Sequence, residues 1–247
     1  MRPVARLTVC HVLADALLLT LGYYWLGVGE GRMPALLWSF LVAFALVTLT
    51  AWTYGAVFVF FSVGHKVAPA YRIALRHLTP LTVAVLAVLA IYYGLARWGE
   101  YSTNPASTLA SYLTLKLRKP VSPHAVSRIF NVALWVVRWV TVPALLAPLL
   151  ANIATHGWAG CRVRALRWFY WIAAPAALLC AIWLPLRILG WVPQTGSFTA
   201  ELASFVLRAF VAYLLFMAGW LALAFVTSAG SPGKFRNFRA VRPFAAE

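Results

Sequence analysis

One histidine and one aspartate lie within the first apolar stretch of the chain, where ionisable side chains are rare. His11 and Asp15 are four residues apart, a spacing that places both side chains on one face of a helix. Such a pair could handle a proton or bind an ion, or it could form a hydrogen bond that packs this helix against its neighbours. Both roles agree with the rule that ionisable groups in a membrane face protein or water. We favour the packing role.

Three arginines lie inside later apolar stretches: Arg138, Arg187 and Arg208. A charged side chain in hydrocarbon costs about 2.5 to 3.5 kcal/mol on insertion scales, so each arginine needs a partner. Glu201 precedes Arg208 by seven residues, which is two helical turns and therefore the same helix face. We predict a cluster of Glu201 with one or more of these arginines. The cluster would be a structural ion network, which we favour, or a cavity lining for an anionic substrate or lipid head group.

The sequence lacks the motifs that mark common catalytic and cofactor sites. It contains no HExxH, GxSxG, CxxC or Walker A pattern, and no paired carboxylates for acid–base chemistry. Of the five histidines, His11 alone lies within an apolar stretch, whereas haem held between membrane helices would need facing histidines. We therefore expect no cofactor and no metal site, and the sequence favours a protein without catalysis.

The composition predicts an all-α, polytopic integral membrane helical bundle. The chain is 63% hydrophobic, whereas soluble domains are about half apolar, and its longest apolar runs match the roughly 20 residues that cross a bilayer. Prolines at 143, 148, 175 and 185 predict kinks in the fourth and fifth spans. We predict one transmembrane domain over 1–228 and a basic cytoplasmic tail over 229–247. The six predicted spans are about 7–28, 34–63, 79–96, 129–153, 168–192 and 202–228.

The distribution of Lys and Arg predicts the orientation. With the N-terminus inside, the inner segments carry 12 of these residues and the outer loops carry 6. Because cytoplasmic loops are enriched in Lys and Arg, this bias favours a multi-pass protein of a bacterial-type inner (plasma) membrane with both termini in the cytoplasm.

The connection over 97–128 is basic even though this orientation places it outside. We call Lys116, Arg118, Lys119 and Arg128 the outer elbow. A short interfacial helix is predicted over about 105–117, before Pro120 and Pro123 interrupt the chain. Three roles stay open: contact with lipid head groups, which we favour, docking of a partner protein, and gating of a substrate.

The net charge of +16 fits basic loops on anionic lipid, and we expect no nucleic-acid partner. The expected partners are a bilayer containing anionic lipids and a membrane protein. We interpret the chain as a non-catalytic subunit or accessory factor of a larger membrane assembly. The alternative is a small transporter or lipid-handling protein that uses the arginine cluster, and a membrane enzyme is the third hypothesis.

Overall fold

The computed structural model describes residues 3–28, 31–101, 103–162, 166–193 and 197–230, and these residues form helices and connections without a β-strand. The predicted all-α fold is confirmed. Most of the predicted basic tail, 231–247, lies outside the described residues.

Six helical segments are long and apolar enough to cross a membrane, as the sequence predicts. A shorter apolar helix would not reach across the bilayer, because a helix rises only about 1.5 Å per residue. The fourth segment is longer than predicted, since it begins at Pro123 rather than near 129 and reaches Gly160. The six are α1 (Pro3–Leu26), α2 (Met33–Ser62), α4 (Leu78–Tyr101), the continuous run of α6 (Pro123–Val136), η1 (Val137–Thr141), α7 (Val142–His156) and η2 (Gly157–Gly160), then α8 (Tyr170–Gly190) and α9 (Phe198–Gly230).

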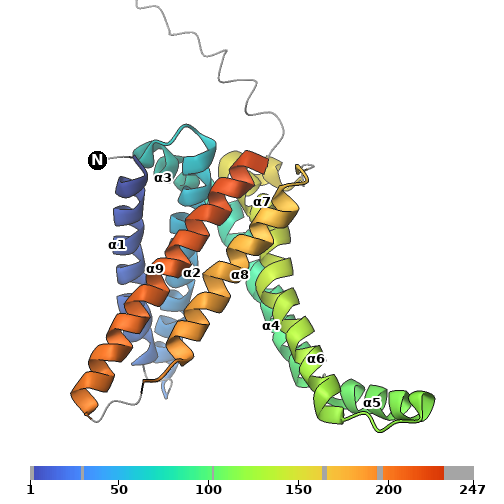
Figure 1. Ribbon diagram of the computed structural model, residues 1–247. Coiled ribbons are helices and arrows are strands. Elements are labelled where there is room, and N and C mark those ends of the chain that lie inside the picture. The colour runs from blue at the N-terminus through green and yellow to red at the C-terminus, as the bar shows by residue number, and fades with distance from the viewer. Residues whose placement is uncertain (1–2, 29–30, 102, 163–165, 194–196, 231–247) are drawn as a thin grey trace, which may run out of the picture.

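Two shorter helices lie at opposite ends of the bundle (Figure 1). The predicted interfacial helix is α5 (Thr103–Leu117), while α3 (Val67–Arg76) was not predicted. α3 buries Ala70 and Ala74, and the Trp52 indole N–H of α2 donates to its Tyr71 carbonyl at 2.9 Å. The start of α1 and the end of α9 lie at the α3 end, so the chain crosses the molecule an even number of times.

The main core lies where α2, α7, α8 and α9 meet, and it includes the buried run of α2 from Ala56 to Phe60. Toward α5, α4 and α6 diverge from α8 and α9 (Figure 1). There a second, small core of Ala106, Ala110 and Val126 packs α5 against α6. The molecule thus has a closed end and an open end.

The fourth span is interrupted close to Pro143. Residues Val137–Thr141 form a π-helical turn in which the Val142 N–H donates to the Val137 carbonyl. Proline has no N–H, and the Tyr92 hydroxyl instead donates to the Arg138 carbonyl at 2.8 Å. In contrast, α8 runs unbroken through Pro175 and Pro185.

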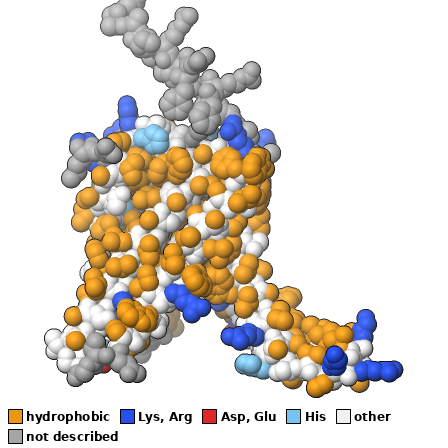
Figure 2. Space-filling model, in the orientation of Figure 1, with side chains coloured by type: hydrophobic (Ala, Val, Ile, Leu, Met, Phe, Trp, Pro, Cys, Tyr) orange, Lys and Arg blue, Asp and Glu red, His pale blue; other side chains and the backbone are white. Residues whose placement is uncertain are grey.

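The surface has the pattern of a membrane protein. Figure 2 shows a broad hydrophobic band between two ends where Lys and Arg gather. Many large apolar side chains within the six segments are exposed, among them Leu19, Phe40 and Val206. In water such a surface would be a liability, whereas lipid chains would cover it. The chain is therefore a multi-pass, membrane-type helical protein.

Candidate functional site

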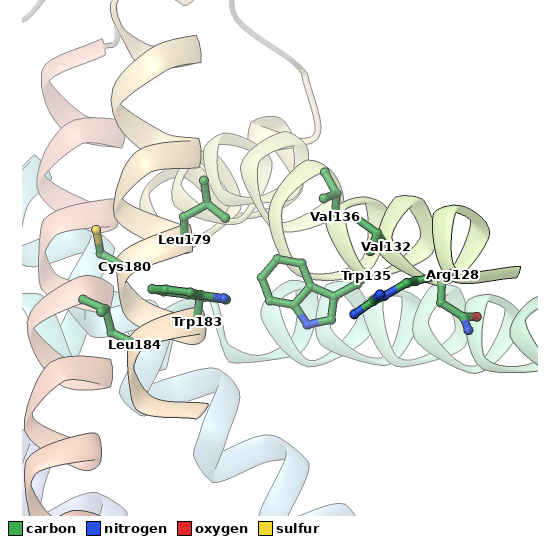
Figure 3. A pocket seen from close by; sticks show the side chains of 9 residues that line it. Arg128, Val132, Trp135, Val136, Leu179, Cys180, Trp183 and Leu184 are labelled. Carbon is green, nitrogen blue, oxygen red and sulfur yellow. The ribbon is translucent and has the colours of Figure 1, made fainter. Parts of the chain in front are cut away.

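A groove opens between α6 and α8 on the side where these helices diverge (Figure 3). Its volume is about 660 Å³. Trp135 of α6 and Trp183 of α8 project toward each other across it. The remaining lining residues are Arg128, Asn131, Val132, Val136, Leu179, Cys180 and Leu184. The groove is almost wholly apolar apart from Arg128 and Asn131, so it suits a hydrocarbon chain.

The packing of the neighbouring helices explains why the groove stays open. α8 packs along α9, while α6 packs against α4 and α5. The fourth span meets α8 through η1 and α7, toward the closed end of the bundle. Beyond that contact, α6 packs through the small core against α5.

One arginine, Arg128, lines this groove, and a second, Arg187, lies one helical turn beyond Trp183 on α8. Arg128 lies seven residues before Trp135 on α6, and its guanidinium points along the same side of the helix (Figure 3). On α8, the Arg187 guanidinium carbon Cζ lies 5.1 Å from the centre of the Trp183 ring. Among the described residues the ion pairs are His11–Asp15 and Arg97–Glu100, so neither arginine has a carboxylate partner. An anion in the groove beside Arg128 would therefore meet an uncompensated cation.

The outer elbow is divided between two places. Lys116, Arg118 and Lys119 are exposed at the α5 end, and Lys116 Nζ lies 5.9 Å from the centre of the Tyr112 ring. Arg118 ends the helix with a φ of 53°. The turn is closed by the Val121 N–H, which donates to Thr114 Oγ1 at 3.0 Å. Arg128 instead belongs to the groove wall.

The predicted cluster of Glu201 with the arginines does not form in the described part of the chain. Glu201 is exposed in the first turn of α9 and has no arginine within 4.0 Å. The seven residues from Glu201 to Arg208 span about 10.5 Å along a helix, which is too far for direct contact. A shared helix face therefore does not bring Glu201 and Arg208 together.

Arg208 is buried, but its partners are backbone carbonyls. Its Nε donates to the Ser204 oxygen at 3.2 Å. Its Nη1 donates to the Leu189 oxygen at 2.9 Å and also to the Trp191 oxygen. Carbonyls at a helix C-terminus lack intrahelical donors, so Arg208 caps α8 from α9. Arg138 is half-buried, and its Nε has no hydrogen-bond partner in the described structure.

The predicted pair of His11 and Asp15 sits at a junction of three helices. His11 Nε2 lies 3.9 Å from Asp15 Oδ2. The Tyr213 hydroxyl of α9 donates to the same carboxylate oxygen at 2.9 Å, and the rings of His11 and Tyr54 of α2 have centroids 4.6 Å apart. The pair therefore links α1 to both α2 and α9, as the packing role requires.

Sequence reasoning missed Trp135, Trp183, Tyr54 and Tyr213. A usable signal existed for the tryptophans, because each shares a helix face with an arginine at a spacing of seven or four residues. No such signal marked the tyrosines, whose partners lie on other helices.

Comparison with protein-family models, with characterised proteins and with solved structures finds no match to this chain. In the described residues, no group of three or more His, Cys, Asp or Glu side chains is placed to hold a metal ion. The feature that can support a functional proposal is therefore the groove between α6 and α8.

Proposed function

We propose that this chain is a non-catalytic membrane protein that holds an anionic phospholipid in the groove between α6 and α8. The observation that carries this proposal is an apolar groove of about 660 Å³ lined by Arg128, with Arg187 stacked on the groove residue Trp183 and neither arginine in an ion pair within the described part of the chain. An acyl chain would lie between Trp135 and Trp183. The phosphate would accept hydrogen bonds from Arg128 and Arg187, since guanidinium groups match phosphate geometry.

Exposed cations support the placement of the head group at the α5 end. Three basic side chains at the α5 end are exposed: Lys116, Arg118 and Lys119. Basic residues near a membrane surface attract anionic lipid. This version of the lipid-handling hypothesis uses Arg187 of the predicted arginine set and Arg128 of the outer elbow, while Arg208 keeps a structural role.

The proposed location is a bacterial-type inner membrane with both termini in the cytoplasm. The excess of Lys and Arg in the sequence segments assigned to the inside supports this orientation. The shared end of the α1 start and the α9 end agrees with it. The groove mouth and α5 would then face the outside of the cell.

Cysteine labelling tests the orientation. In a C10A/C180A background, native Cys161 reports on the α3 end, and Ser111→Cys adds an exposed thiol on α5. We expect an impermeant maleimide to label the introduced thiol in intact cells and Cys161 only after the cells are opened. The same background without Ser111→Cys controls for the site of labelling. Protection of the introduced thiol until lysis, with Cys161 labelled in intact cells, would reverse the orientation.

Native mass spectrometry tests the lipid site. We expect wild-type protein to retain added phosphatidylglycerol in preference to phosphatidylcholine. Arg128→Gln with Arg187→Gln should lower this retention by about tenfold or more, because a hydrogen bond to a charged group is worth about 1.5 to 3 kcal/mol. Arg72→Gln with Arg76→Gln removes the same charge from exposed positions on α3 and should leave retention near wild type. Equal losses in both double variants would point to non-specific charge and contradict the site.

A second candidate function is that of a subunit or accessory factor. The observation in its favour is the arm of α4, α5 and α6, which departs from the bundle and has its own small core. We propose as the alternative that another membrane protein docks against this arm. Site-specific crosslinking from Tyr112, which is exposed on α5, would capture that protein in native membranes. Crosslinking to lipid alone would count against the subunit hypothesis.

A further inference from the structure

His11 is the least satisfied ionisable side chain of the bundle interior. It is 0% exposed, and neither Nδ1 nor Nε2 has a hydrogen-bond partner among the described residues. A neutral imidazole carries one donor and one acceptor, and burial without partners is unfavourable for both. A fully buried ring in this state gains stability from any group that satisfies one of its nitrogens.

The surroundings identify the chemistry of that group. Asp15 Oδ2 faces Nε2 at 3.9 Å, which is longer than a hydrogen bond, and Tyr213 donates to this oxygen from α9. From α2, Tyr54 contacts the ring. From α3, the Tyr71 hydroxyl is buried and has no hydrogen-bond partner among the described residues. One carboxylate and one imidazole, without a third strong ligand, suit a proton better than a metal ion.

We propose that His11 and Asp15 form a proton-binding site inside the membrane domain. On acidification, the Nε2 lone pair accepts a proton from hydronium, which leaves as water, and Nε2 becomes an N–H donor. That N–H then approaches the Asp15 carboxylate and forms an imidazolium–carboxylate pair with it. The neighbouring tyrosines stay neutral partners, and burial raises the pKa of Tyr71 to about 12. This proposal is independent of the lipid groove.

A second groove offers a route for the proton. It has a volume of about 790 Å³ between the start of α1 and the start of α3. Arg6 and Lys66 line it and are exposed at the α3 end. Its lining also includes Cys10 and Tyr71, and Cys10 directly precedes His11 in α1. Water entering this groove would reach α1 at Cys10, while His11 itself does not line the groove.

Nitrogen-15 NMR of protein labelled at histidine, in lipid bilayers, tests the proposal. His11→Gln assigns the His11 signals. We expect these signals to change from a neutral tautomer to imidazolium as the pH falls from 8 to 4. Asp15→Asn should abolish this change or move its midpoint at least one pH unit toward acid. Tyr213→Phe, which keeps the carboxylate, should retain the change.

The wild-type titration decides the matter even if Asp15→Asn fails to fold. A His11 ring that stays neutral down to pH 4 in folded wild-type protein would overturn the proposal. An Asp15→Asn protein that titrates like wild type would overturn the role of the carboxylate.

Discussion

Replacing Gly219 with alanine destabilises the folded bundle, although alanine is the better helix former by about 1 kcal/mol. A Cβ at Gly219 of α9 would overlap the Cβ of Ala181 in α8 and lie 2.9 Å from its Cα. These atoms belong to backbone or sit next to it, so the two helices must separate. Overpacking of this kind typically costs about 1 to 3 kcal/mol. Equilibrium unfolding of the protein in mixed detergent micelles measures the change.

The contact between Gly219 and Ala181 also predicts a compensating substitution. Ala181→Gly removes the atom that the new methyl group meets, so Ala181→Gly with Gly219→Ala should recover most of the lost stability. Gly94→Ala is the matched control, because a Cβ at Gly94 of α4 would have nothing within 4 Å. That variant should equal or exceed wild type in stability. Failure of the double variant to recover would mean that α8 and α9 do not approach each other through this pair.

The membrane fold was predictable because it depends on the length of apolar runs. Lipid requires each crossing helix to satisfy its own backbone, so six runs gave six helices. The ends were less certain, since α6 starts at Pro123, six residues before the predicted boundary near 129. α3 was missed because its ten residues are amphipathic and lie outside any long apolar run. The π-helical turn depends on how Pro143 and Tyr92 meet in space.

The candidate sites were likewise predictable only where the interacting residues lie on one helix. The pair of His11 and Asp15 was readable because both residues lie on one helix at a spacing of four. The expectation for Arg208 failed because backbone carbonyls of Leu189 and Trp191 satisfy it, and carbonyls carry no sequence signal. The groove was not predictable at all, because it is the space left where α6 diverges from α8.

Tyr170→Ala is expected to give the largest loss of stability, about 3 to 5 kcal/mol by analogy with other large-to-small core substitutions. Tyr170 begins α8 and is 0% exposed within the main core. A Cβ at Gly230 would lie 3.3 Å from the Tyr170 Cβ, which indicates how tightly the end of α9 packs here. Its hydroxyl donates to the Ala144 carbonyl of α7 at 2.6 Å. One side chain thus joins three helices at the closed end.

Two further variants separate the packing of Tyr170 from its hydrogen bond. Tyr170→Phe keeps the ring and should lose about 0.6 kcal/mol and no more than about 1.7 kcal/mol, the average and the maximum for hydrogen bonds between membrane helices. Tyr23→Ala truncates a tyrosine of α1 that is 82% exposed and should change stability little. The free energy of unfolding in mixed micelles compares all three variants. If Tyr170→Ala were no worse than Tyr23→Ala, the closed end would not be packed around this ring. The open groove at the other end would then lack the rigid support that a defined lipid site requires.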